Sequence, residues 1–399
     1  MSATDLENAV DGGGADRTGG ERVGRRALLG GLAGTAAAAV VLRPGLAIGD
    51  DQEDPRPLGT VPRAGAGGTV REVTLYAVAG PGNRLAYGTT PENASIPGPT
   101  IEAIEGDEIR VTLVNTTSLT VSLHAHGVDV PAADDGTPAN GSVVAAGARH
   151  TYVWRTHAPT KRADGTWEPG SAGYWHYHDH AVGTAHGTDG ITRGLYGALV
   201  VRRPGDPLPE KQFVTVFNEL TINNSAVPDS INYSANLGQR VEWIMITHGV
   251  ASFHTFHTHA HRWADNRTGL LSGDDDRTSV IDNRTTGPGE SFGFQIIAGE
   301  HVGPGTWMYH CHVQFHSDGG MIGIFTVNNA DGTPPPGHTE HMANHREMAA
   351  MMMSAGGHAA HGGSEPAKAQ VAGSPTISQS DVPGGGDEDA HAGHEGHGG

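Results

Sequence analysis

The stretch Trp307-Met308-Tyr309-His310-Cys311-His312 repeats an earlier one, Trp175-His176-Tyr177-His178-Asp179-His180, after 132 residues. Further upstream in each half, His124-Ala125-His126 lines up with His257-Thr258-His259, at a separation of 133 residues. Two motif pairs in register indicate an internal duplication. The sequence therefore predicts two copies of one domain, joined by a short linker near Arg203–Lys211.

The duplicated region, from about Thr69 to Val327, consists of short β-rich runs separated by Gly and Pro. Short strands at fairly regular spacing predict an all-β fold of sandwiches or barrels. The expected strands include Ile109–Val114, His150–Trp154, Ala198–Val201, Phe213–Phe217, Val241–Ile246, Phe292–Ile297 and Ile322–Val327.

The composition narrows the class of protein. The 399 residues carry a formal charge of −19, which disfavours nucleic acid, because phosphates require clustered Lys and Arg. A single Cys excludes an internal disulfide framework and any Cys-rich zinc module. The chain nevertheless has 25 His, and imidazole is the commonest metal ligand in proteins. These features predict a metalloprotein.

The N-terminal segment has the features of an export signal. Arg25-Arg26 precede an apolar stretch from Ala27 to Leu42, which small residues follow. The paired arginines favour twin-arginine export, so we expect a signal over residues 1–50, a linker over 51–67 and a secreted or cell-envelope location. The alternative is a membrane anchor, but the stretch is shorter than the roughly 20 apolar residues that a span needs.

The C-terminal segment, residues 331–399, is rich in Gly, Ala, Ser and acidic residues. It has too few aliphatic and aromatic residues to offset the entropy of ordering, so we expect disorder, with at most a transient helix over Glu340–Ser354. Its His residues and its Met351-Met352-Met353 run suit copper in either oxidation state. A merely solubilising tail is the alternative.

The four His-x-His motifs indicate metal sites. Side chains at i and i+2 of a strand point to one face, so each motif presents two imidazoles on the same side. The four motifs together place eight imidazoles in equivalent positions of the two repeats. Apolar side chains there would bury more apolar surface, so eight imidazoles are expected only if they bind metal. By the same alternation, Cys311 points to the face opposite His310 and His312.

Cys311 also defines a second kind of site, because two His, one Cys and a weak axial Met are the ligands of blue copper. His254 upstream and His316 and Met321 downstream complete such a set in the second repeat. The first repeat has no equivalent set, and Met308 at the position of His176 indicates that His176 is a neighbour of the site rather than a ligand. The equivalent residues in the first repeat are Val121, Asp179, Thr184 and Asp189.

Taken together, the four signatures resemble those of multicopper oxidases, most closely the bacterial two-domain small laccases, over about Gly68 to Val327. The resemblance implies two tandem cupredoxin-like Greek-key β-barrel domains, over residues 68–203 and 204–330. It also implies four coppers per chain. The implied ligands are His254, Cys311, His316 and Met321 for type 1 copper, His124 and His257 for type 2 copper, and His126, His178, His180, His259, His310 and His312 for the type 3 pair.

In that family, phenols or aromatic amines give single electrons to the type 1 copper, and dioxygen is reduced to water at a three-copper cluster. Because each domain carries half of the cluster ligands, the cluster must form between a first and a second domain. The short linker and the resemblance imply that the two domains come from different chains, so that a head-to-tail homotrimer closes into a ring.

Val130 and Asp135 lie close in sequence to the first His-x-His motif. Many small laccases carry a Tyr where this chain has Val130, which puts a tyrosyl radical role in doubt. Asp135, in an Asp-Gly-Thr turn, resembles the acid that delivers protons to the cluster in that family. An ordinary turn aspartate is the alternative.

Other functions remain open at this stage. Copper nitrite reductase also has two cupredoxin domains, but its blue site lies in the first of them. A copper-binding protein without turnover and a cuprous oxidase for copper tolerance are further alternatives, which the His/Met-rich tail favours. About four coppers per chain would indicate an oxidase, and one or two would indicate another function.

Overall fold

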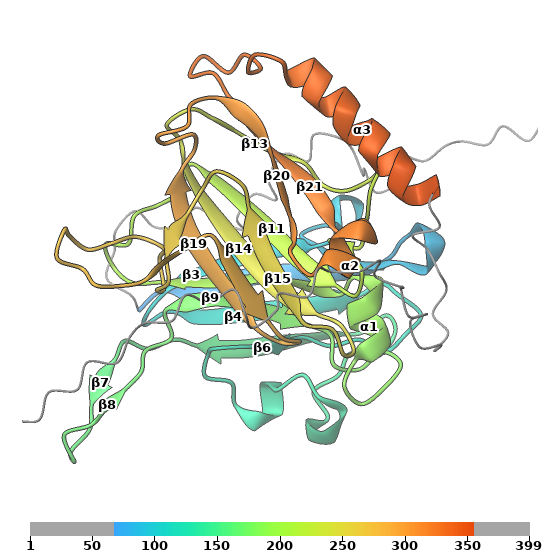
Figure 1. Cartoon of the computed structure of the whole chain (residues 1–399). Coiled ribbons are helices and arrows are strands. Elements are labelled where there is room, and N and C mark those ends of the chain that lie inside the picture. The colour runs from blue at the N-terminus through green and yellow to red at the C-terminus, as the bar shows by residue number, and fades with distance from the viewer. Residues whose placement is uncertain (1–67, 355–399) are drawn as a thin grey trace, which may run out of the picture. The chain divides into compact units, whose positions relative to one another are not determined.

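The computed structural model describes residues 68–354 and confirms an all-β protein. Each repeat is a Greek-key β-barrel of two main sheets (Figure 1). In the first repeat the strand orders are β2-β1-β4-β6 and β3-β10-β9-β5, and in the second they are β12-β11-β14-β19 and β13-β21-β20-β15-β18. Two short ribbons, β7-β8 and β16-β17, extend from the sheets.

All seven strands expected from the sequence are present. The strands of the first repeat are β1 Val70–Ala79, β2 Leu85–Gly88, β3 Gly98–Ile104, β4 Glu108–Asn115, β5 His124–Ala125, β6 Arg149–Arg155, β7 Thr160–Lys161, β8 Trp167–Glu168, β9 Gly173–His178 and β10 Tyr196–Arg202. Those of the second repeat are β11 Lys211–Asn218, β12 Thr221–Ile222, β13 Tyr233–Asn236, β14 Arg240–His248, β15 His254–Thr258, β16 Trp263–Ala264, β17 Val280–Ile281, β18 Asn283–Thr286, β19 Ser291–Ile297, β20 Gly305–Cys311 and β21 Ile322–Asn328. The helices are α1 Thr188–Arg193, α2 Gln314–Asp318 and α3 His338–Ser354, with single 3-10 turns at Pro81–Asn83, Pro91–Asn93, Ala132–Asp134 and Pro138–Asn140.

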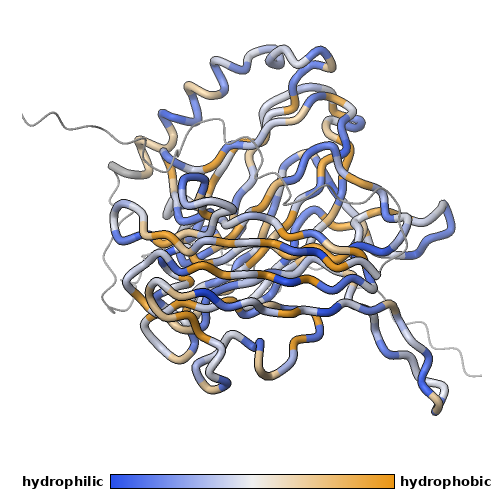
Figure 2. Tube along the Cα trace, turned by 180° about the vertical axis from the view of Figure 1, so that it is seen from behind, coloured by the Kyte–Doolittle hydropathy of each residue, from blue (hydrophilic) through white to orange (hydrophobic). Residues whose placement is uncertain are grey.

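Alternation of polar and apolar residues gives each barrel its inside and outside (Figure 2). In β4, Ile109, Val111 and Leu113 are fully buried while the residues between them are not. Such alternation is expected where one sheet face meets a core and the other does not. Trp154 and Trp243 lie in the cores of the first and second repeat.

The duplication is visible in matched details of the two repeats. Tyr177 of β9 and Tyr309 of β20 are the register partners of Gly197 and Gly323, and each ring lies against its glycine on the neighbouring strand. A Cβ atom on either glycine would lie only 2.4 Å from the tyrosine hydroxyl, so each position requires glycine. The two repeats therefore share the same contact between a Tyr ring and a Gly of the neighbouring strand.

The two repeats pack against each other through a continuous apolar layer. Tyr196 and Val200 of β10 share a buried cluster with Val214 of β11 and Ile244 of β14. Arg202 lies beside this layer and forms ion pairs of 2.8 Å with Glu102 and 2.7 Å with Glu242. This interface places β9 of the first repeat next to β14 and β19 of the second.

The helix expected over Glu340–Ser354 is present as α3, but it is packed on the second repeat, so the expectation of disorder after residue 331 is wrong for this segment. This helix packs on the outer face of β20 and β21, where Ala349 is 1% exposed and where Met348 and Met352 contact the same buried patch. The segment has few aliphatic residues, but methionine supplies the apolar contacts of the helix instead. Within residues 68–354, no helix is long and apolar enough to cross a membrane. The predicted signal, the linker over 51–67 and the tail over 355–399 lie outside the described residues.

Candidate metal centres

The first candidate centre lies inside the second repeat. His254, Cys311 and His316 have potential ligand atoms within 4.8 Å of one another. The Cys311 Sγ atom lies 3.6 Å from His254 Nδ1 and 3.5 Å from His316 Nδ1. Met321 is fully buried in the same core cluster as Cys311. The structure thus brings together the blue-copper set that the sequence predicted.

Strand register explains why these side chains converge. Cys311 ends β20 and pairs with Phe256 of β15, so that both residues face the core. His254 lies two residues before Phe256 and points to the same face. His316 lies in α2, which begins three residues after the end of β20. Burial raises the pKa of the Cys311 thiol, so that its thiolate form requires an adjacent cation.

The opposite face of the same two strands carries a second cluster of imidazoles. His257 and His310 are register partners, and with His259 they form a compact group. The Nε2 atoms of His259 and His310 lie 3.4 Å apart. The His312 ring centroid is 5.4 Å from that of His257 and 5.3 Å from that of His310. All four predicted cluster ligands of the second repeat therefore share one face.

The first repeat forms a matching cluster. His124 of β5 is the register partner of His178 of β9, and with His126 they form a group whose ligand atoms lie within 4.8 Å. The Nε2 atoms of His126 and His178 are 3.1 Å apart. The His180 ring lies 5.2 Å from the His124 ring. We call these two clusters the half-sites of the first and second repeat.

Hydrogen bonds to backbone carbonyls fix the tautomers of five half-site histidines. A carbonyl oxygen can only accept, so an Nδ1 atom that bonds to it carries the proton and leaves a lone pair on Nε2. Such second partners orient metal-binding imidazoles in many proteins. The donors and acceptors are His124 to Asp135 (2.7 Å), His178 to Asp179 (2.7 Å), His180 to Ala185 (2.7 Å), His257 to Asp282 (2.8 Å) and His310 to Cys311 (2.9 Å).

The electrostatic environment keeps several of these imidazoles neutral. Burial, together with the neighbouring His124 and His180, lowers the pKa of His126 to about 4. Burial and the adjacent His316 lower the pKa of His254 to about 4. A neutral imidazole is the form that binds metal ions, so both kinds of site are suited to a cation.

Two further histidines lie behind the half-site of the first repeat. His176 stacks on His126 with a centroid separation of 4.0 Å, and His248 of β14 contacts His176 edge-on at 5.0 Å. The Nε2 atoms of both are buried without a hydrogen-bond partner. His176 is therefore a neighbour of the site, as the repeat alignment indicated. His248 gave no signal in the sequence, because it is a single His on a strand without a counterpart in the first repeat.

The first repeat has no thiolate at the position of Cys311. Asp179 stands there, fully buried, and accepts hydrogen bonds from the backbone N–H groups of Ser122, Ala181 and Val182. Burial raises the pKa of Asp179 to about 6. Among the described residues, no metal-type group includes Asp179, or the equivalent positions Val121, Thr184 and Asp189.

Asp135 adjoins the half-site of the first repeat. Its backbone carbonyl accepts the His124 hydrogen bond, and its carboxylate Oδ1 lies 3.5 Å from His124 Nδ1. Gly136 has φ +76°, and a Cβ there would lie 2.0 Å from the Leu123 carbonyl oxygen, so this turn requires glycine. Val130 is half-buried against the core of the first repeat.

Each half-site draws its residues from one repeat alone. Among the described residues, no group of potential ligands combines His124, His126 or His178 with His257, His259 or His310. A single chain in this conformation therefore presents two separate groups of histidines.

Comparison with known proteins identifies the family. Two family models described as multicopper oxidase match residues 86–206 and 203–331. A probable nitrite reductase-hydroxylamine oxidoreductase fusion protein of Kuenenia stuttgartiensis is 32% identical over 258 residues, which cover 58% of this chain and 28% of that protein. Human ceruloplasmin is 25% identical over 284 residues, which cover 61% of this chain and 24% of that protein. The solved blue copper oxidase from Nitrosomonas europaea shares 24% identity and a TM-score of 0.48, covering 66% of this chain and 86% of that chain.

The chain is thus a two-domain member of the multicopper oxidases, and membership of this family implies copper binding. It spans only about a quarter of the length of the curated relatives that it matches.

Proposed function

We propose that this protein is a laccase-type multicopper oxidase, which takes single electrons from phenols or aromatic amines and reduces dioxygen to water. The observation that carries the proposal is the position of Cys311. Its thiol faces the His254–His316 pair, while the residues on either side of it, His310 and His312, face the half-site. The end of β20 thus connects the proposed electron-accepting site at Cys311 to the proposed oxygen-reducing site at His310 and His312 through the covalent backbone.

The residues present fit copper at the first centre. Each of two Nδ1 atoms lies within 3.6 Å of the thiol sulfur, and a buried Met belongs to the same core cluster as the Cys. His254, Cys311, His316 and Met321 would hold type 1 copper, which supplies one-electron redox chemistry when bound. The chain keeps Cys311, His254 and Met321 buried, and strand pairing holds the thiol in place.

Exposed aromatic side chains favour an aromatic electron donor. Phe253 directly precedes His254 and is 64% exposed, and Phe315 directly precedes His316 and is 73% exposed. Both rings adjoin the candidate copper ligands in sequence and are open to solvent, so they are candidate contact residues for an apolar donor. A flat phenol ring that stacks on either side chain would contact a residue that directly adjoins a proposed copper ligand in the sequence.

The half-sites favour assembly between chains. We infer that the first repeat of one chain meets the second repeat of the next, so that His124 and His257 hold type 2 copper. The type 3 pair would take His126, His178, His180, His259, His310 and His312. A head-to-tail contact of this kind closes into a ring, for which a homotrimer is the proposed form. Each chain would then carry four coppers.

Asp135 is the proposed proton donor of the cluster. Its carboxylate accepts hydrogen bonds from Thr137 and Asn140 and lies beside His124, which positions it between solvent and the half-site. Reduction of dioxygen to water consumes protons, so an acid at this position is chemically appropriate. We also propose that the N-terminal segment directs twin-arginine export.

Nitrite reduction is the second candidate, because one relative is described as a probable nitrite reductase fusion protein. The complete set of eight half-site histidines argues for a multinuclear cluster instead. Cuprous oxidation is a variant of the main proposal that differs only in the electron donor.

Oxygen uptake by copper-loaded protein with a simple phenol tests the proposal. We expect uptake by the wild type, with about four coppers per chain, and loss of both the blue colour and the uptake in Cys311→Ser. The same preparations are then given nitrite without oxygen. Nitrite consumption without oxygen uptake would favour the second candidate, and a blue, active Cys311→Ser would contradict the type 1 assignment.

A further inference from the structure

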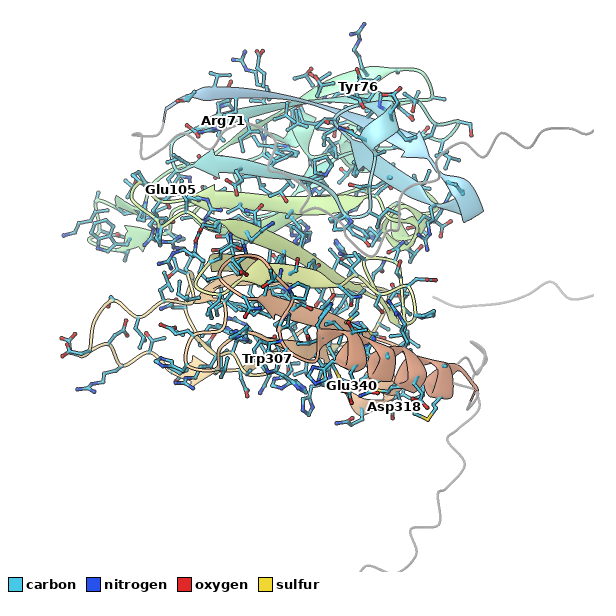
Figure 3. All side chains as sticks on the ribbon, turned by 90° about the horizontal axis from the view of Figure 1, so that it is seen from above. Arg71, Tyr76, Glu105, Trp307, Asp318 and Glu340 are labelled. Carbon is cyan, nitrogen blue, oxygen red and sulfur yellow. The ribbon has the colours of Figure 1, made fainter. Side chains whose placement is uncertain are left out.

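Helix α3 brings a set of soft side chains to the outer face of the second repeat. It lies along β20 and β21 (Figure 3), and its first residue, His338, hydrogen-bonds through Nδ1 with Thr306 Oγ1 at 3.2 Å. Met348 and Met352 are one turn apart on the face that carries the buried Ala349. The helix therefore points these two thioethers at the sheet.

The sheet contributes a third thioether at the same place. Met308 of β20 contacts the patch of Val227, Ile322 and Ala349 that Met348 and Met352 also contact. It lies two residues before His310 on the same strand face, and Ile322 is the register partner of His310. Three thioethers thus gather beside the half-site of the second repeat.

A half-buried imidazole, that of His345, lies on the same side of the helix. It lies one turn before Ala349, and its Nε2 atom is buried without a hydrogen-bond partner. Burial lowers the pKa of His345, with a further contribution from Arg346. A buried polar atom without a partner normally indicates an unseen water, ion or ligand.

We propose that Met308, His345, Met348 and Met352 form a binding site for a cuprous ion. Thioether sulfur is a soft ligand that selects Cu(I) over harder divalent ions, and one imidazole completes a ligand set common for copper. The ion is held here as cargo beside the half-site, where it is available for loading. The site is distinct from the twelve ligands assigned above.

The alternative explanation is apolar packing alone, because Met often fills gaps between a helix and a sheet. Two observations favour a site. Packing does not account for the orphaned His345 nitrogen. In addition, the equivalent of Met308 in the first repeat is His176, which faces the second repeat instead of a helix, so this position carries a thioether only in the repeat that α3 covers.

Leucine substitution separates the two explanations, because Leu keeps the volume and apolarity of Met but has no sulfur. The test titrates Cu(I) into the full-length apoprotein against a colorimetric Cu(I) chelator, for the wild type and for Met308→Leu/Met348→Leu/Met352→Leu. We expect the triple variant to bind one Cu(I) fewer per chain, or to bind that ion at least about tenfold more weakly. X-ray absorption of the wild type with one Cu(I) per chain should show copper–sulfur scattering, also in the Cys311→Ser background.

Loading kinetics provide the functional measurement. With limiting Cu(I), the triple variant should acquire its oxidase coppers more slowly than the wild type, and with excess copper it should reach the same copper content. The role of the site in copper loading rests on the proposed oxidase function, but Cu(I) binding to the site does not. The titration therefore tests the site even if the oxidase proposal fails. Equal Cu(I) affinity in the triple variant, with thermal stability unchanged, would overturn the site and leave packing as the role of these residues.

Discussion

At the scale of single residues, orientation rather than identity separates ligands from neighbours. His176 and His178 lie on the same strand face, two residues apart. His178 has its Nδ1 proton bound to a carbonyl and its Nε2 3.1 Å from His126 Nε2, whereas His176 stacks flat on His126. Only His178 therefore presents a lone pair to the half-site.

Alanine substitution at these two positions should have unequal effects. His178→Ala should lose about one copper or more per chain and most of the activity, because a ligand is removed. His176→Ala should retain nearly full copper and lose part of the activity through a less ordered His126. Copper analysis of both purified variants measures the difference, and equal losses would show that the repeat alignment is wrong at this motif.

Asp135 offers a second test at this scale. Asp135→Asn keeps the backbone carbonyl that accepts the His124 hydrogen bond but removes the acid. We expect unchanged copper content and a turnover about a hundredfold lower, the usual scale of a lost general acid. An active Asp135→Asn variant with wild-type turnover would leave Asp135 as an ordinary turn residue.

At the scale of elements, a buried charge cluster joins the two repeats. Burial alone would raise the pKa of Glu242, but hydrogen bonds from Arg202, Gln212 and Tyr174 and the charge of Arg202 lower it below its ordinary value of 4.5. A depressed carboxyl pKa stabilises the fold above the unfolded-state pKa, and this contribution is lost as the pH falls through the folded-state value.

Glu242→Gln should therefore destabilise the protein by about 3–5 kcal/mol near neutral pH, because Arg202 loses a buried partner. The difference between wild type and variant should shrink as the pH falls well below 4.5. Denaturant unfolding at neutral and acidic pH measures it. A difference that is independent of pH would mean that the Glu242 charge does not stabilise the interface.

Helix α3 can be tested by truncation shortly after Val327. Removal of the helix uncovers Val227, Met308 and Ile322, so we expect a loss of stability of about 2–4 kcal/mol. Turnover of a small phenol should remain largely intact once copper is supplied in excess, because none of the proposed oxidase ligands lies in the removed segment. If the fully loaded truncated protein were inactive, the tail would be part of the catalytic site.

At the scale of the whole molecule, the features that could be predicted are those that follow from the repeated motifs. Two copies of Trp-x-Tyr-His-x-His and of His-x-His determined the duplication, the strand faces and the position of Cys311. The place of His248 and the packing of α3 could not be predicted in this way. His248 meets the half-site only through the packing of β14 on β9, and α3 is held by methionine contacts with residues that are distant in sequence.

The central claim concerns how the two half-sites meet, and co-expression of two inactive variants tests it most directly. His126→Ala damages the half-site of the first repeat, and His310→Ala damages that of the second. If neighbouring chains share each cluster, random mixing gives about one quarter of the clusters two intact halves, and oxygen uptake should return to about that fraction. Mixtures that stay inactive although both variants fold and co-assemble, or a wild type that is fully active as a four-copper monomer, would contradict the account.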